Sequence, residues 1–157
     1  MPTAVQHQHT INIHQSITTN QVSVNISGVT IPLSNHVKIL GVVLDPCITL
    51  SEHTKAISKS CFYHIRALKH IRDSLDSSTI HTIAAALVTR LDYANSVLYG
   101  IPTKYISCLQ HTQNTLARVV AGNRTPGSHL ATLSKLHWLP VHDRIKFKIA
   151  TMTYTYW

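Results

Sequence analysis

The segment SEHTKAISKSCFYHIRALKHIRDSL, residues 51–75, carries the clearest structural pattern in the chain. Its apolar residues recur at steps of three, four or seven, at Ile57, Cys61, Ile65, Leu68 and Leu75. At about 100° per residue these positions share one face of a helix. The opposite face carries basic residues within roughly 80° of one another, namely Lys55, Lys59, Arg66 and Lys69. With Ser51 as a cap and Glu52 in the first turn, the pattern predicts an amphipathic helix with a basic outer side.

The sequence after this segment predicts further helices. One follows a cap at Asp76-Ser77-Ser78 and is expected to run toward Leu98. The next begins near Pro102, which suits a helix start, and stops at Gly122. A basic loop, a short helix and a last helix opened by proline are then expected at 123–128, at about 129–137 and from Pro140.

The front of the chain predicts strands. Apolar and polar residues alternate over 22–26 and again over 29–33, on either side of Ser27-Gly28, which is typical of a β-hairpin. The apolar run Val37–Leu44 suits a strand that is buried on both faces. Residues 1–20 mix Gln, Asn, Thr and His with few large apolar side chains, and this composition predicts a disordered head.

These patterns together predict an α+β fold, with a short N-terminal β-hairpin or meander followed by a bundle of four or five α-helices. The expected organisation is a disordered head at 1–20, strands at 21–46 and a helical region at 47–157. A chain of 157 residues is long enough for one modest core.

Formal charge is confined to the chain from Lys38 onward. Fourteen Lys and Arg stand against six Asp and Glu, which gives a net charge of +8 and a pI near 9.7. Such an excess favours a polyanionic partner, because rows of cations neutralise phosphates and release counterions. The alternative is that the basic residues form ordinary solvated helix faces. The low number of acidic residues favours contact with nucleic acid.

Three cysteines without a CxxC motif are typical of a reduced intracellular protein, nuclear or cytoplasmic, and not of a disulfide scaffold. No run of about 18 apolar residues is present, so no membrane partner is expected. A basic segment followed by an apolar one is absent from the first residues, so no signal peptide is expected.

Motifs for catalysis or cofactors are weak. The sequence has no GxxxxGK[ST], GxGxxG or GxSxG motif, and no small-molecule substrate is expected. Its six carboxylates never adjoin, although a two-metal site needs converging carboxylates. Two Cys-x-x-His pairs, Cys61/His64 and Cys108/His111, could build a zinc site, and Cys61 could be a nucleophile. Both pairs fall within predicted helices, where a cysteine is usually a packing residue, so neither a metal site nor a catalytic residue is predicted.

Several segments resemble LINE-type (non-LTR) retrotransposon reverse transcriptases, with jockey-like elements the most similar group. They occur in the family's order and lie within residues 22–154. The matching segments are ILGVVLD at 39–45, SCFYHIRAL at 60–68, RLDYANSVLYG at 90–100, QNTLAR at 113–118 and LHWLPV at 136–141, followed by RIKFK at 144–148.

This resemblance implies the primer-grip strands at the end of the palm, followed by the thumb helices that hold a template–primer duplex. The family is an RNA-directed DNA polymerase whose Mg²⁺ is held by palm carboxylates, including a YADD-type pair, in motifs that precede this region. The chain therefore resembles a fragment without the catalytic centre, inactive on its own, although its enzymatic status stays open. The implied partner is an RNA/DNA duplex, and no cofactor is expected here. The predicted contacts are Lys38, Leu40, Gly41, Lys55, Lys59, Arg66 and Lys69.

The sequence departs from the family pattern in three places. A residue that the family usually has between the equivalents of Thr89 and Arg90 is absent, and Ala94 stands where the family usually has Cys. The family also typically continues beyond Tyr156-Trp157. Loss of one residue inside a helix would rotate everything after it by about 100° and misplace the apolar face. Two alternatives therefore stand: a helical protein-interaction module, or a decayed element product with no selected function.

Overall fold

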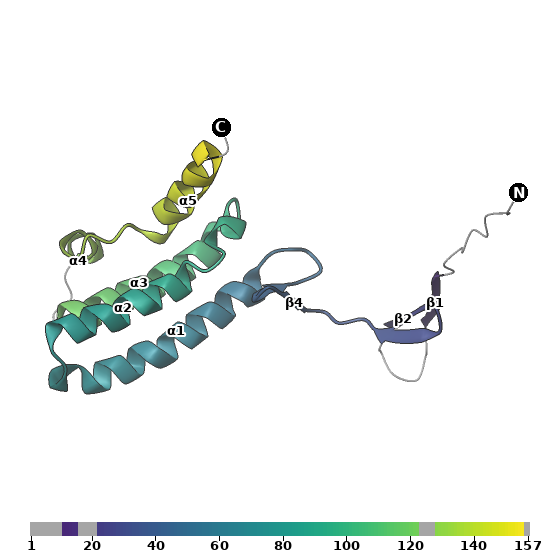
Figure 1. Cartoon of the computed structure of the whole chain (residues 1–157), viewed down its shortest axis with the longest axis horizontal. Helices are drawn as coiled ribbons and strands as arrows, with labels where there is room; N and C mark the ends of the chain where they lie inside the picture. The colour runs from purple at the N-terminus through teal and green to yellow at the C-terminus, as the bar shows by residue number, and fades with distance from the viewer. Residues whose placement is uncertain (1–10, 16–21, 123–127, 156–157) are drawn as a thin grey trace, which may run out of the picture. The chain divides into compact units, whose positions relative to one another are not determined.

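A computed structural model of the chain describes residues 11–15, 22–122 and 128–155. It divides into two compact units, residues 1–37 and residues 38–157. Short antiparallel strands come first and five α-helices follow (Figure 1). The predicted α+β class and helical bundle are therefore confirmed.

The first unit contains a three-stranded sheet in the order β1 (Ile11–Gln15), β2 (Val22–Ile26) and β3 (Val29–Pro32). The predicted hairpin at Ser27-Gly28 is confirmed, since both residues have positive φ and β2 pairs antiparallel with β3. The prediction of a disordered head at 1–20 is wrong for Ile11–Gln15, which form β1 and pair antiparallel with β2. Alternation of Ile and polar residues over 11–14 was the available signal. The rest of that head lies outside the described residues.

The predicted single strand over Val37–Leu44 is wrong. The structure has two short strands there, β4 (Val37–Ile39) and β5 (Val42–Leu44), which pair around a turn at Leu40-Gly41. Both turn residues have positive φ, 46° and 82°, which is the geometry of a two-residue hairpin turn. Leu40 is 86% exposed, so the run is not buried on both faces.

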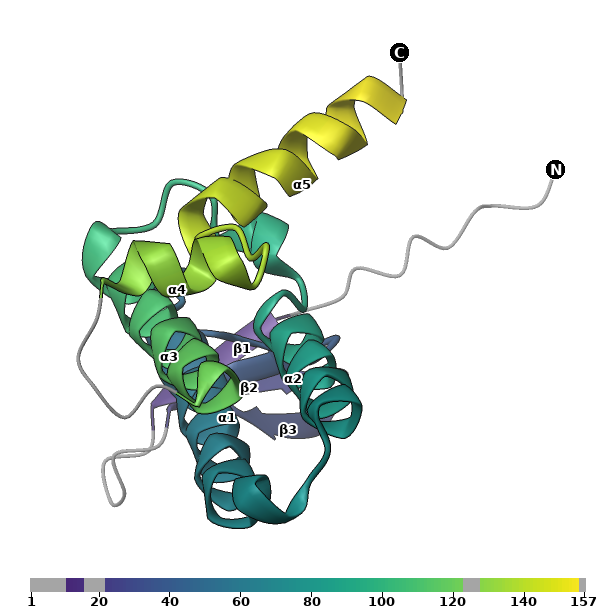
Figure 2. The same ribbon diagram turned by 90° about the vertical axis from the view of Figure 1, so that its left-hand side faces the viewer.

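Three long helices form the body of the second unit: α1 (Ser51–Ile71), α2 (Ser77–Leu91) and α3 (Thr103–Ala121). They pack against one another, as Figure 2 shows, and β5 packs on α1. Short 3₁₀ helices η1 (Arg72–Ser74) and η2 (Asn95–Leu98) follow α1 and α2. Helix α4 (His129–Lys135) packs on α3, while α5 (Val141–Thr155) packs on α3 and η2. Buried leucines, such as Leu68, Leu91 and Leu109, fill the shared core.

The helix boundaries partly follow the predictions. Gly122 ends α3 with a φ of 67°, and Asp76 caps α2 by accepting a hydrogen bond from the Thr79 amide, both as expected. Leu50 holds the cap position of α1, so the predicted capping role of Ser51 is wrong. Its amide instead donates to Thr49 Oγ1, which lies in the preceding turn.

Helix α2 ends at Leu91, and the prediction that it continues toward Leu98 is wrong. Ala94 takes a left-handed conformation, with a φ of 52°, so the chain turns before η2 begins. The buried residues of α2 keep steps of three and four on both sides of Thr89-Arg90. They are Ile80, Ala84, Leu87 and Leu91. The apolar face of α2 is therefore continuous, and the rotation expected from a missing residue does not disturb it.

Candidate nucleic-acid interface

The predicted basic face of α1 is confirmed as an exposed surface. Lys55, Lys59, Arg66 and Lys69 are all exposed, and we call these four residues the α1 row. The opposite side of the helix is buried and includes Cys61, Ile65 and Leu68. Fourteen residues separate the first and last members of the row, a rise of about 21 Å at 1.5 Å per residue. That length corresponds to about six nucleotide steps of one strand, at ~3.4 Å each.

The charge of the α1 row is only partly neutralised from within the helix. Lys55 Nζ lies 2.8 Å from Glu52 Oε1, and this hydrogen bond raises the pKa of Lys55. No ion pair among the described residues involves Lys59, Arg66 or Lys69. These three cations are the members of the row that can pair with an anion outside the chain.

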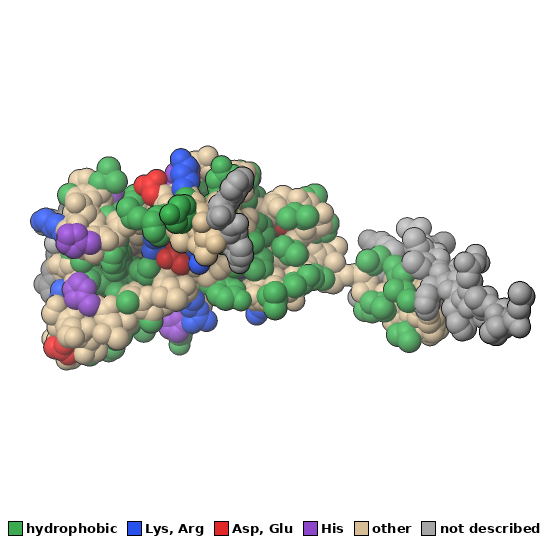
Figure 3. Space-filling model, turned by 45° about the horizontal axis from the view of Figure 1, so that its top comes forward, with side chains coloured by type: hydrophobic (Ala, Val, Ile, Leu, Met, Phe, Trp, Pro, Cys, Tyr) green, Lys and Arg blue, Asp and Glu red, His purple; other side chains and the backbone are tan. Residues whose placement is uncertain are grey.

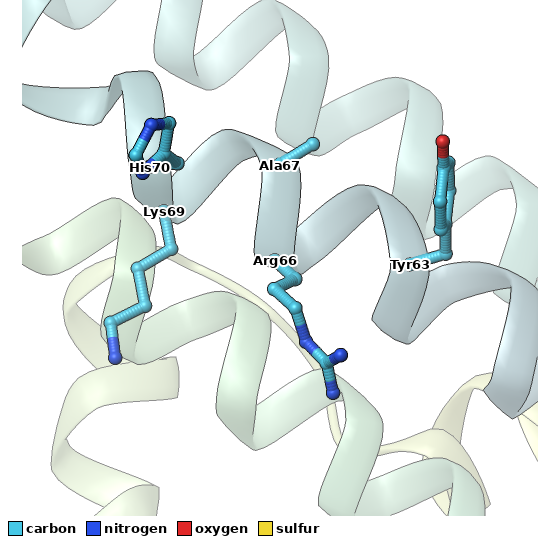
Figure 4. A pocket seen from close by; sticks show the side chains of 5 residues that line it. All are labelled: Tyr63, Arg66, Ala67, Lys69 and His70. Atoms are coloured by element: carbon cyan, nitrogen blue, oxygen red, sulfur yellow. The ribbon is translucent and has the colours of Figure 1, made fainter.

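A shallow hollow lies beside the C-terminal half of the row. It is lined by Tyr63, Arg66, Ala67, Lys69 and His70, all from α1 (Figure 4). Arg66 and Lys69 point to one side of the helix, whereas Tyr63 and His70 point to the other. Tyr63 is 74% exposed, so its ring is open to stacking. The hollow thus lies between two cations on one side and an exposed aromatic ring on the other, and such side chains bind nucleic-acid backbones and bases respectively. The sequence analysis did not predict a role for Tyr63 and His70, although both lie within four residues of Arg66.

The other predicted contacts, Lys38, Leu40 and Gly41, lie at the β4–β5 turn. Tyr93 Oη donates a hydrogen bond to the Leu40 carbonyl over 2.7 Å. A Cβ at position 41 would lie 3.1 Å from Tyr93 Cε1, so glycine is needed there both for its φ and for this close approach. The structure therefore gives Gly41 a packing role against Tyr93, whereas Leu40 contributes its backbone carbonyl and keeps its side chain exposed.

Lys38 and Gly41 line a different hollow from the α1 row. The α1 residues in that hollow include His53, Ala56 and Ser60. At 100° per residue, these positions centre about 130° around the helix from the row. The structure therefore divides the predicted contacts into two surfaces. The α1 row forms one, and the β4–β5 turn contributes to the other.

The remaining basic residues are spread over the helical unit. In the view of Figure 3, Lys and Arg side chains are separated by hydrophobic side chains. Arg144 is mostly buried, with its side chain 13% exposed, and its Nη1 lies 3.1 Å from Asp92 Oδ2. Burial raises the pKa of Asp92, and the Arg144 charge opposes that shift. Arg144 is therefore committed to a contact within the chain. Arg124, in the predicted basic loop, lies outside the described residues.

The carboxylates and Cys-x-x-His pairs have local roles. Asp45 accepts hydrogen bonds from the amides of Cys47 and Thr49, which close a turn and lower its pKa. His64 Nε2 lies 3.4 Å from Arg90 Nη1, whereas Cys108 Sγ lies 3.3 Å from Ser58 Oγ. Among the described residues, no three His, Cys, Asp or Glu side chains are grouped so as to hold a metal ion.

No protein-family model, curated protein or solved structure matches the chain. Among the described residues, no helix has the length and apolar character needed to cross a membrane.

Proposed function

We propose that the helical unit is a nucleic-acid-binding region of a LINE-type retrotransposon reverse transcriptase, and that the α1 row binds the backbone of a template–primer duplex. The observation that carries this proposal is the exposure of four cations along one side of α1, opposite its buried face. The resemblance supports it, because residues 60–68, which contain Arg66, resemble a family motif, and this segment takes its place in the family's order of motifs.

The α1 row would position a duplex without reading its sequence. Lys59, Arg66 and Lys69 each offer charged donors to phosphate oxygens, and such contacts fix register and orientation. Lys55 contributes less, because Glu52 is already bound to it. The sequence has no adjacent pair of Asp residues, so we assign binding to this chain and no step of nucleotide transfer.

The test is a salt titration of RNA–DNA duplex binding by the full chain. Reversing two charges of the row, Lys59→Glu with Arg66→Glu, should weaken binding at low salt. It should also lower the slope of log K against log salt by about 2, roughly one per lost phosphate contact. Fluorescence anisotropy of a labelled duplex between about 50 and 200 mM salt would measure both quantities.

A matched control reverses two exposed cations outside the row, Lys104→Glu with Lys135→Glu. It changes net charge by the same amount, so it isolates position from total charge. We expect a clearly smaller loss of affinity than for the row variant. Equal losses in the two variants, or unchanged binding of the row variant at both salt extremes, would contradict the assignment.

A further inference from the structure

Two adjoining hollows lie between α1 and α2. The first, of about 640 Å³, includes Lys38, Ala56 and Tyr93 among its lining residues. The second, of about 340 Å³, includes Ala67, Ile71 and Ile83. Ala86 and Arg90 line both hollows, so the two adjoin along α2. We call the combined surface the α1–α2 groove.

Small apolar side chains line both parts of the α1–α2 groove, between polar ones such as Ser60 and His64. Ala56, Ala67 and Ala86 are exposed there, Ile71 is exposed at its far end, and Ile83 is half-buried. Ala56 and Ile71 are fifteen residues apart on α1, which is about 22 Å or four helical turns. Small side chains along such a length allow another helix to approach closely. The dimensions therefore suit a helical segment of about 15 residues.

The charged side chains of the groove have one sign. Lys38 and Arg90 line it, and no Asp or Glu is among the lining residues. No ion pair among the described residues involves either cation. Arg90 lies where the two hollows adjoin, with its Nη1 3.4 Å from His64 Nε2 of α1. An anionic side chain on a bound partner could pair with it, whereas a basic partner would be repelled.

His53 holds an unused donor beneath the same surface. Its side chain is 2% exposed, and its Nδ1 accepts a hydrogen bond from the Val43 amide. The proton of the neutral ring is then on Nε2, which is buried and has no partner among the described residues. A buried donor without an acceptor is costly, but Nε2 lies beneath the surface, so a bound segment would reach it only if the wall of the hollow moved.

We propose that the α1–α2 groove binds an acidic amphipathic helix. Its apolar residues, spaced at i, i+3, i+4 and i+7, would lie over Ala56, Ala67 and Ala86, and its carboxylates would meet Arg90 and Lys38. Nucleic acid is the poorer fit, since binding along a phosphate backbone needs a row of cations and only Lys38 and Arg90 line this groove among neutral side chains. The proposal does not depend on the α1 row.

The test uses the full chain and a synthetic 18-residue peptide with Leu at helical spacing and Glu elsewhere. A scrambled peptide of identical composition is the control, because it keeps the charge and loses the apolar face. Alanine methyl NMR reports the location. We expect the methyl signals of Ala56, Ala67 and Ala86 to shift on binding, while that of Ala117, buried in α3, stays unchanged.

Variants separate this surface from the α1 row. Arg90→Glu should weaken peptide binding at least tenfold, whereas Lys69→Glu, the same charge change on the row, should weaken it less than threefold. Lys69→Glu should instead weaken duplex binding. Ala86→Lys should also weaken peptide binding despite its added charge, because it obstructs the groove.

Several results would overturn the proposal. The first two are absence of peptide binding and equal binding of the scrambled peptide. The others are tighter peptide binding by Ala86→Lys, and displacement of the peptide by an RNA–DNA duplex that is lost in Arg90→Glu. Failure of the α1 row to bind duplex would leave the peptide result unaffected, so the two proposals can fail separately. Circular dichroism of each variant would establish that its helices are intact.

Discussion

Arg144 Nη1 lies 3.1 Å from Asp92 Oδ2, and this ion pair joins the residue after α2 to α5. Asn95 Nδ2 donates to the other oxygen of Asp92 over 3.2 Å. A second link lies nearby, because Gln113 Nε2 donates to the Leu139 carbonyl over 2.8 Å. These residues belong to the segments that resemble reverse transcriptases. The resemblance thus includes residues that hold α2, α3 and α5 together.

We expect Arg144→Met to destabilise the helical unit by about 1–3 kcal/mol. It leaves the partly buried Asp92 carboxylate without its cation, and an uncompensated charge in such a site is costly. Lys146→Met is the control, because Lys146 is exposed on the same helix and should change stability by less than about 0.5 kcal/mol. Urea unfolding would measure both.

The double variant Asp92→Asn with Arg144→Met completes the comparison. Removing both charges should recover part of the loss, since no unpaired carboxylate remains. Equal stability of Arg144→Met and Lys146→Met would show that the ion pair does not hold α5 in place.

The α1 face could be predicted from the sequence because it depends on residues within one helix. Its buried stripe and exposed row follow directly from the spacing of Cys61, Ile65 and Leu68 against Lys59 and Arg66. The end of α3 could also be predicted from neighbouring residues alone, since Gly122 supplies the positive φ that ends the helix. Local chemistry was enough for these elements.

The turn at Leu40-Gly41 could not be predicted in the same way. An unbroken apolar run gives no periodicity by which to separate one strand from two. The partner of the turn is Tyr93, whose hydroxyl comes from 53 residues further along the chain. The α1–α2 groove was missed for a related reason, because Ala67 and Ala86 form one surface only after two helices pack.

Tyr93→Phe should loosen the β4–β5 turn. It removes the hydrogen bond to the Leu40 carbonyl and keeps the ring that contacts Gly41, at a cost of about 0.5–1.5 kcal/mol. Amide hydrogen exchange should become faster at residues 41–43 and stay unchanged in the middle of α3. Tyr99→Phe is the control, since Tyr99 is also exposed and has no side-chain hydrogen bond among the described residues. The same exchange rates in both variants would contradict this role for Tyr93.

His53 should make the stability of the helical unit dependent on pH. Burial lowers its pKa below the ordinary 6.5, so the folded chain keeps the ring neutral. The unfolded chain binds the proton first as pH falls below 6.5. The stabilising contribution is therefore complete above pH 6.5 and is lost as pH falls through the lower pKa of the folded state. We expect the melting temperature to fall between pH 7.5 and pH 5.

His53→Gln tests the source of this pH dependence. The Gln side-chain oxygen can accept the Val43 amide hydrogen bond in place of Nδ1, and glutamine does not titrate. The melting temperature of His53→Gln should therefore change less between pH 7.5 and pH 5 than that of the parent chain. His81→Gln, on the exposed side of α2, controls for the loss of one histidine from the twelve in the chain. If His53→Gln kept the full pH dependence of the parent, protonation elsewhere would be responsible, and the buried neutral ring would have no part in it.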